Sequence, residues 1–303
     1  MAGYTDAAFR SVCVEFGAFF CFTEMVSADA LSRKNLKTLR LLDRAPNERL
    51  IGFQIFSSDP LTAAAAVRLI APLAPAAIDL NCGCSVPKVL KGGCGAILMR
   101  TPDIIGSILA AMKGETDIPV SVKLRSGWDA SSINYLACAE AAVKAGASLV
   151  TLHPRTRAQG FSGKSQWEHI RILKENCPVT VFGSGDLFSA SDCKAMLERT
   201  GCDGVMIARG CLGNPFIFAE TQALLSGRGD APPVSPERKM RTALRHLCLL
   251  ADSLGEAIAC REMRKHFVAY TKGLEGGALV RQSVVYANTI AEYEEIVESY
   301  LRT

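Results

Sequence analysis

Short apolar runs alternate with helix-patterned segments along the first 226 residues. The apolar runs predict seven buried β-strands, at residues 19–26, 50–56, 77–81, 119–125, 149–155, 179–183 and 204–209. Helix starts are marked at Asp59 and Thr101, where a capping side chain directly precedes a proline. Repeated strand-then-helix units predict an α/β protein with a (β/α)8 TIM barrel, since such a parallel sheet closes at eight strands. A doubly wound open sheet is the alternative.

The predicted barrel is one strand short at its beginning. The chain opens with MAGYTDAAFR, in which Thr5-Asp6 is a suitable cap for a helix over 7–16. Residues 1–4 then correspond to the loop that follows a first strand. We therefore expect a truncated first strand, from a trimmed or misassigned start, rather than an imperfectly closed barrel, because an open barrel exposes two unpaired sheet edges.

The alternation of apolar runs with helix-patterned segments ends after residue 226. Residues 227–236 are rich in glycine, proline and serine and predict an extended linker. Residues 237–303 have helical apolar spacing and no strand signal, so they predict a small all-helical domain behind a barrel domain of residues 1–226. Residues 238–281 contain nine basic and four acidic side chains. This excess indicates either an ordinary solvated surface or a face that contacts nucleic-acid phosphates.

Composition narrows the class of protein. In a chain of 303 residues, 49% hydrophobic and 21% charged residues allow a large core and exclude a disordered protein. The net charge of +4 permits a polyanionic partner without requiring one. The 12 cysteines are scattered, with no C-x-x-C and no Cys/His pair at zinc spacing, which favours a reducing cytoplasm and no metal site. No apolar run approaches the ~20 residues that span a bilayer, so no membrane partner is expected.

The strongest candidate for chemistry is the segment at residues 77–99. A buried strand ends at Asn81, and a loop with Cys84 and then a glycine cluster follows. In a parallel α/β protein such a loop lies at the carboxyl ends of the strands, where the chemistry takes place. The Cys84 thiol has three candidate roles there: nucleophile, proton donor or packing.

Other strand ends carry groups suited to a planar redox cofactor. Gln54 offers an amide for the edge of a heterocycle. Lys123 and His153 are two potentially cationic groups on neighbouring strands that can stabilise a developing negative charge. Taken singly, Lys123 also fits a Schiff-base or ion-pair lysine, and His153 fits a hydrogen-bonded core residue.

Glycine-rich turns follow the last two predicted strands. Barrels of this kind commonly bind a phosphate there through backbone N–H groups. The residues predicted to form this cup are Gly185, Ala208, Arg209 and Gly210. A GSGD turn alone fits an ordinary β-turn, but a phosphate cup together with the groups above describes a site for FMN.

A series of segments, in one order along the chain, carries a family resemblance. They are MAGYTDAAFR, GFQIFSSDP, DLNCGCSVPKV, GGCGAILM, VKLRSGWD, HPRTRAQGFSG with Trp167, FGSGD, GVMIARGCLGNPFIF and CREMRKHFVAYTKGL. Together they resemble the bacterial tRNA-dihydrouridine synthase family. The resemblance implies an FMN-dependent (β/α)8 barrel with a C-terminal helical tRNA-binding domain, which reduces the C5=C6 bond of particular uridines with NADPH as the usual reductant. It also implies a cytoplasmic protein, and we expect a monomer with tRNA and NADPH as partners.

The resemblance implies roles for individual side chains. Cys84 is the expected general acid, Asn81 is expected beside the substrate base, and Arg155 and Arg157 are candidate RNA-facing cations. The residues expected to hold FMN are Met1, Ala2, Gly3, Gln54, Lys123, His153, Ser184, Gly185, Asp186, Ala208 and Arg209. A thiol suits the acid role because its usual pKa of ~8.5 keeps it protonated at neutral pH yet allows it to give up the proton.

The sequence departs from the family pattern beside Cys84. The family loop usually has Gly-Cys-Pro, whereas here Ser85 follows the cysteine and the proline comes at Pro87. Cys82 and Cys94 flank the site and are potential disulfide partners on oxidation. Two other functions fit the same residues: an FMN-dependent barrel oxidoreductase acting on a free pyrimidine, like dihydroorotate dehydrogenase, and an RNA-binding relative without catalysis.

Overall fold

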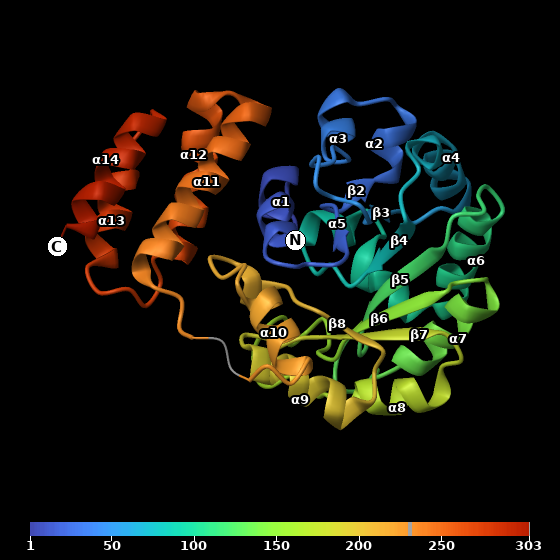
Figure 1. Ribbon diagram of the computed structural model, residues 1–303. Coiled ribbons are helices and arrows are strands. Elements are labelled where there is room, and N and C mark those ends of the chain that lie inside the picture. Colours follow the sequence, from blue (N-terminus) through green and yellow to red (C-terminus); the bar gives the residue numbers. More distant parts are fainter. Residues whose placement is uncertain (230–231, 303) are drawn as a thin grey trace.

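The computed structural model describes residues 1–229 and 232–302. Parallel strands form a curved sheet with helices packed around its outer side (Figure 1). The strands are β1 (Cys21–Phe22), β2 (Val26–Ser27), β3 (Ile51–Phe56), β4 (Ala77–Cys82), β5 (Val120–Arg125), β6 (Leu149–His153), β7 (Thr180–Ser184) and β8 (Gly204–Met206). Each predicted strand region contains a strand, although the first is divided into β1 and β2.

The order of the strands decides the architecture. Neighbours follow chain order, β1-β3-β4-β5-β6-β7-β8, with β2 also pairing with β3, and every ladder of the sheet is parallel. A doubly wound sheet reverses its order part-way, so the fold is TIM-barrel-like. Within residues 1–229 and 232–302 no ladder joins β8 to β1, so the sheet is open between these two strands.

Helices connect the strands and cover the outside of the sheet. They are α1 (Ala7–Glu15), α2 (Ala28–Ser32), α3 (Leu36–Arg40), α4 (Pro60–Ile70), α5 (Pro87–Lys91), α6 (Pro102–Lys113), α7 (Tyr135–Lys144), α8 (Glu168–Asn176), α9 (Ala190–Thr200) and α10 (Ile217–Leu225), with 3₁₀ turns η1 (Ala71–Leu73), η2 (Gly95–Arg100) and η3 (Arg209–Cys211). α4 begins as predicted, because the Asp59 side chain accepts the Thr62 N–H at 2.7 Å. α6 begins at its proline without a side-chain cap from Thr101.

Alternation along β4 separates the core from the barrel interior. All of its residues are buried. Ile78, Leu80 and Cys82 belong to the apolar cluster that the sheet forms with its covering helices. Asp79 and Asn81 point the other way, because side chains alternate along a strand. One strand thereby contributes both to the core and to a polar interior.

The C-terminal helices form a unit with its own core. They are α11 (Pro236–Leu254), α12 (Glu256–Tyr270), α13 (Gly277–Val284) and α14 (Ile290–Leu301). Met263, Phe267 and Tyr293 are 0% exposed in this core. α1 lies between the helical unit and the barrel (Figure 1), and its Ala8 joins the helical core. Residues 230 and 231 of the predicted linker 227–236 lie outside the described residues.

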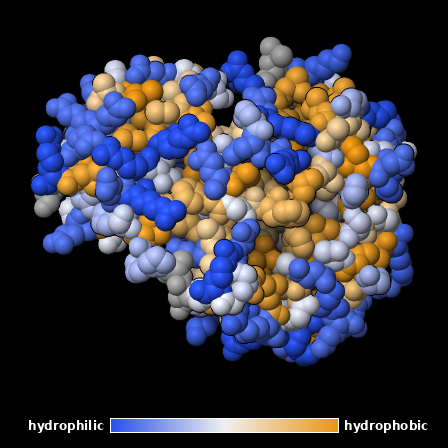
Figure 2. All heavy atoms as spheres, viewed as in Figure 1, coloured by the Kyte–Doolittle hydropathy of each residue, from blue (hydrophilic) through white to orange (hydrophobic). Residues whose placement is uncertain are grey.

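Polar and apolar side chains are unevenly distributed over the face that Figure 2 shows. Figure 2 shows hydrophilic side chains over the helical unit and the rim of the barrel, with apolar ones gathered between them. Among the helices of the described residues, none combines the length and the hydropathy that crossing a bilayer requires.

Candidate active site

The carboxyl ends of the strands surround a cavity of about 660 Å³. Its walls come from the N-terminus and from the loops that follow the strands, which meet because the strands are parallel. The predicted site residues that line it are Met1, Ala2, Gln54, Asn81, Cys84, Lys123, His153, Ser184, Gly185, Asp186, Ala208 and Arg209. The volume is in the range of small-molecule and cofactor sites.

The loop that carries Cys84 is held by hydrogen bonds on both sides. The Asn81 side-chain oxygen accepts the N–H groups of Gly83 and Cys84, at 3.1 and 2.9 Å. Arg125 Nε donates to the Gly83 carbonyl at 2.8 Å. The Ala96 N–H donates to the Cys84 carbonyl at 2.9 Å. These contacts give the loop a defined shape although no proline follows the cysteine directly.

A glycine of the following cluster makes room for this loop. Gly95 has a φ of +71°, and a Cβ there would lie 2.6 Å from the Cys84 carbonyl oxygen and 3.1 Å from Cys84 Cβ. The backbone conformation and the close contact both exclude a larger residue. Gly95 therefore determines how near the thiol loop comes to η2.

A chain of hydrogen bonds connects the Cys84 loop to the neighbouring strands. Asn81 Nδ2 donates to Gln54 Oε1 at 2.8 Å, and Gln54 Nε2 donates to Asp79 Oδ2 at 2.8 Å. Ser121 Oγ donates to Asp79 Oδ1 at 2.6 Å. Asp79 is 1% exposed, and burial raises its pKa to about 6. Sequence reasoning missed Asp79; an acid inside an apolar strand, two positions before Asn81 and so on the same face, was the available signal.

Burial and neighbouring cations determine the charge of the cavity wall. Burial, and then Arg125, lower the pKa of Lys123 to about 8. Burial, and then Lys123, Arg125, Arg155 and Arg209, lower the pKa of His153 to about 2. The expectation of two cationic groups is therefore wrong for His153, which is neutral because it is buried among cations. Of these two side chains, Lys123 is the one that carries a positive charge.

The turns after β7 and β8 pack too closely for side chains. Gly185 has a φ of +107°, and a Cβ there would lie 2.4 Å from Ser165 Oγ and 2.6 Å from His153 Cδ2. A Cβ at Gly210 would lie 1.9 Å from the Leu187 carbonyl oxygen. Ser165 Oγ is buried and has no hydrogen-bond partner within the described residues. Both glycines thus bring backbone to the cavity wall, as a phosphate cup requires.

Arg209 forms the rim of this end of the cavity. Its guanidinium carbon lies 4.3 Å from the centroid of Phe161 and 5.4 Å from that of Phe188. The two rings are 58% and 52% exposed. A guanidinium stacked between aromatic rings at a cavity mouth is positioned to meet an anionic or planar ligand.

Three predicted site residues lie elsewhere. Arg155 is 2% exposed and forms paired hydrogen bonds with Asp186, at 2.8 and 2.7 Å, so its expected role as an RNA-facing cation is wrong. Arg157 stacks on Trp128, with its guanidinium carbon 4.7 Å from the ring centroid, and does not line the cavity. Gly3 is exposed and also lies outside the cavity wall.

The Arg155 contact also defines what Asp186 does. Burial alone raises the pKa of Asp186, but hydrogen bonds from Arg155 and from the Ser165 N–H lower it overall. The carboxylate is thereby committed to protein partners. The side chain holds the turn after β7 in place, and only the remaining surface of the residue faces the cavity.

Comparison with known proteins identifies the family. The family model described as dihydrouridine synthase (Dus) matches residues 1–302. The chain belongs to the dihydrouridine synthase family. A probable tRNA-dihydrouridine synthase of Treponema pallidum is 44% identical over 98% of this chain and 90% of its own length. The tRNA-dihydrouridine synthase B of Proteus vulgaris is 32% identical over 99% of this chain and 93% of its own length.

Family membership makes the chain an oxidoreductase that acts on a CH–CH bond of uridine. Among solved structures, a histamine dehydrogenase from Rhizobium sp. 4-9 is similar to it, with a TM-score of 0.55 and 15% sequence identity. The similarity covers 82% of this chain and 47% of that chain. At this level of identity it shows a shared fold, which agrees with the TIM-barrel-like strand order.

Proposed function

We propose that the protein is a tRNA-dihydrouridine synthase that uses FMN and NADPH, with Cys84 as the general acid. The observation that carries the proposal is that the Cys84 loop and the glycine turns after β7 and β8 border one cavity. The family and the named relatives support uridines of tRNA as the substrate. The protein acts in the cytoplasm as a monomer, with the barrel of residues 1–226 for FMN and the helical domain of residues 237–303 for tRNA.

The cavity fits a flavin phosphate by its backbone and its charge. Gly185 and Gly210 bring backbone to the wall after β7 and β8. Lys123 and Arg209 add positive charge to the same cavity. The unpartnered Ser165 hydroxyl beside Gly185 is a further donor. Bound FMN supplies the hydride that reduces the uracil C5=C6 bond.

Cys84 Sγ holds the proton that the reduced base requires at C5. Hydride addition at C6 leaves negative charge conjugated to the C4 carbonyl, and a protonated thiol neutralises it by giving its proton to C5. Asn81 and Arg125 orient this thiol through the backbone of its loop. Gln54 and Asp79 in turn hold Asn81 through the hydrogen-bonded chain from the neighbouring strand. The base must leave its stack to reach the cavity.

The helical domain provides the positive surface for tRNA. Arg261 and Lys272 are exposed, and no ion pair within the described residues neutralises them. Arg241 and Lys265, by contrast, pair with acidic neighbours. The electrostatic contact to phosphates is therefore expected to depend mainly on the unpaired cations.

Replacement of Cys84 by alanine tests the acid assignment. Cys84→Ala is expected to retain flavin absorbance, tRNA binding and NADPH-driven flavin reduction, and to lose about 10²–10⁴-fold in dihydrouridine formation, the usual contribution of a general acid. The assay measures the dihydrouridine that each purified variant forms in tRNA, with tRNA from a strain lacking the enzyme as the substrate. Cys82→Ala is the matched control, because Cys82 is 0% exposed in the core and does not line the cavity.

Three outcomes contradict the proposal. Normal dihydrouridine formation by Cys84→Ala means that another group is the acid. A colourless protein that binds tRNA means an RNA-binding relative without catalysis. Turnover of free uracil derivatives in preference to tRNA means a free-pyrimidine oxidoreductase.

A further inference from the structure

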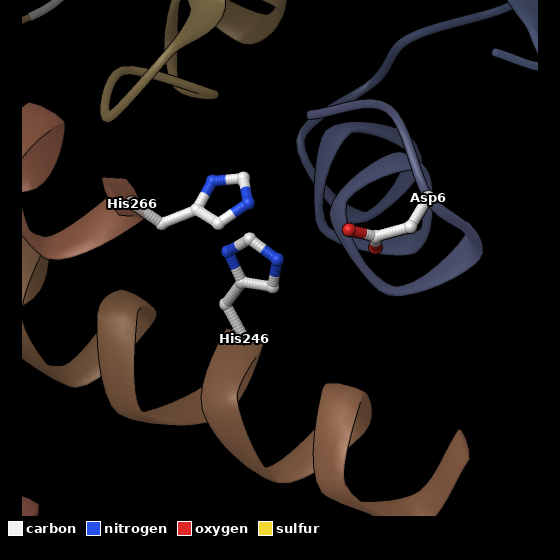
Figure 3. Close-up of side chains that lie close together, drawn as sticks. All are labelled: Asp6, His246 and His266. Atoms are coloured by element: carbon white, nitrogen blue, oxygen red, sulfur yellow. The ribbon is translucent and has the colours of Figure 1, made fainter. Parts of the chain in front are cut away.

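A second cluster of titratable side chains lies between the helical domain and the barrel. Asp6 caps the N-terminus of α1, His246 lies on α11 and His266 lies on α12. One potential ligand atom from each lies within 4.8 Å of the other two. In Figure 3 the Asp6 carboxylate points toward the two imidazole rings. The ring centroids are 4.4 Å apart, with an angle of 67° between the rings.

The two histidines are buried without hydrogen-bond partners. Both are 0% exposed, and within the described residues none of their four ring nitrogens has a partner. The Tyr270 hydroxyl is also buried and unpartnered, and its ring centroid lies 6.1 Å from that of His246. Buried polar atoms are nearly always paired in native proteins, because leaving them unpaired is costly. Such a concentration of unpaired atoms at one place indicates a missing ligand.

The three side chains together suit a metal cation. Both rings are 0% exposed and unpartnered within the described residues, and a carboxylate lies beside them. A neutral imidazole presents one nitrogen lone pair, which is the form that binds metals. A cation between the three side chains offsets the cost of a buried carboxylate and uses both lone pairs.

We propose that Asp6, His246 and His266 bind one divalent transition-metal ion, with Zn²⁺ the best match. Two imidazole nitrogens and a carboxylate oxygen are ligands that Zn²⁺ takes in proteins, whereas Mg²⁺ and Ca²⁺ prefer oxygen ligands alone. One Asp6 oxygen accepts the Phe9 N–H at 2.9 Å and leaves the other for the metal. To bind one tetrahedral ion, the three donor atoms must approach to about 3.3 Å from one another. A solvent molecule then provides the fourth ligand.

The sequence expectation of no metal site rested on spacing. Asp6 and His266 are at opposite ends of the chain, and 20 positions separate the two histidines. No local zinc pattern arises from such spacing, so only the packing of α1 against α11 and α12 brings the ligands together.

The ion connects the helical domain to the wall of the active-site cavity. Met1, Tyr4 and Thr5, which are among the five residues before Asp6, line that cavity. α1 is also tied to the barrel by the buried pair of Arg10 with Glu48, at 2.7 Å. A metal at the start of the same helix holds α11 and α12 in one position relative to the cavity. Its role is structural, and it is independent of which substrate the cavity accepts.

Metal titration of the full-length protein tests the site. After removal of metal with a chelator, the protein is titrated with Zn²⁺ by calorimetry and with Co²⁺ by absorption spectroscopy. We expect one equivalent of each per chain, and a Co²⁺ spectrum of a low-symmetry nitrogen and oxygen site without thiolate charge-transfer bands. The thiolate bands matter because the chain has 12 free cysteines that bind Zn²⁺ when they are accessible.

Two variants separate ligation from packing. Asp6→Asn retains a side-chain acceptor for the Phe9 N–H, so α1 keeps its cap, but the amide is a much poorer ligand. It is expected to weaken Zn²⁺ binding about tenfold or more. His266→Phe removes a ligand at similar volume and should abolish binding. His169→Phe is the control, because His169 lies on α8, bonds Ser126 and is not one of the three proposed ligands.

The outcomes are decisive in either direction. Binding that is weakened about tenfold or more in Asp6→Asn and kept in His169→Phe supports the site, even if His266→Phe fails to fold. The proposal is wrong if the wild-type chain binds no equivalent of Zn²⁺, if Asp6→Asn binds Zn²⁺ as tightly as the wild type, or if the Co²⁺ spectrum shows thiolate ligands. Activity with tRNA is not part of this test, so its result is separate from that of the proposed function.

Discussion

Replacement of Asn81 by alanine is expected to release the loop that presents the Cys84 thiol. Asn81 is 7% exposed and makes three hydrogen bonds, two from its oxygen to the loop and one from its nitrogen to Gln54. Each such bond contributes about 0.5–1.5 kcal/mol, so their sum predicts a loss of about 2–4 kcal/mol in the free energy of unfolding. For a chain of 303 residues this corresponds to a fall of about 3–6 °C in Tm.

The same change is expected to reduce turnover with tRNA. A catalytic group displaced by about 1 Å commonly costs about 10²-fold in rate. The assays are thermal unfolding followed by tryptophan fluorescence, and dihydrouridine formation under saturating NADPH. Flavin reduction by NADPH should be unchanged, because it does not require the thiol.

Thr151→Val is the matched control for this experiment. Thr151 is 0% exposed on β6, beside Lys123, and its hydroxyl has no partner within the described residues. Its replacement by valine removes a polar atom but no hydrogen bond, so Tm should stay the same or rise. The reasoning is refuted if Asn81→Ala melts within about 1 °C of the wild type and keeps its turnover.

Three further predictions concern the loop, the cofactor and the RNA. Gly95→Ala should lower Tm and tRNA turnover more than Gly201→Ala, because both glycines have positive φ but only the former meets backbone within 3 Å; equal effects of the two changes would contradict the packing argument. FMN affinity should fall as the pH rises through about 8, because Lys123 is cationic below its pKa and neutral above it; Lys123→Met should bind FMN more weakly and without this pH dependence, as measured by flavin fluorescence. Affinity for tRNA should fall steeply with salt, and Arg261→Glu with Lys272→Glu should weaken binding and reduce the salt slope in a filter-binding assay; an affinity independent of salt would exclude the electrostatic contact.

The fold class followed from the local pattern. Apolar runs separated by capped helices predicted the parallel strands, because strand burial and helix caps depend on neighbouring residues. The division of the first strand into β1 and β2, and the early end of β8 at Met206, did not follow from it. Strand limits depend on which partner residues are available for pairing, and β8 has a ladder on one side alone within the described residues.

Most of the residues predicted for the site do line the cavity. Gln54, Lys123, His153 and Cys84 meet there because each follows or ends a parallel strand, and the carboxyl ends of such strands share one face. Arg155 was misjudged because its sequence context, at the end of the predicted strand 149–155, does not show that Asp186 lies within hydrogen-bond distance. The charge of His153 was misjudged for the same reason, since its cationic neighbours come from other strands and loops.

The sequence by itself determined the order of elements, the family and the thiol at a strand end, because these depend on residue type and local spacing. The tertiary structure alone decided which side chains of the cavity are charged and how Asp79, Gln54 and Asn81 hold the thiol loop. It also decided that Asp6 lies beside His246 and His266. Hydrogen bonds and pKa values depend on distances between residues that are far apart in the chain, and these distances exist only once the helices and strands have packed.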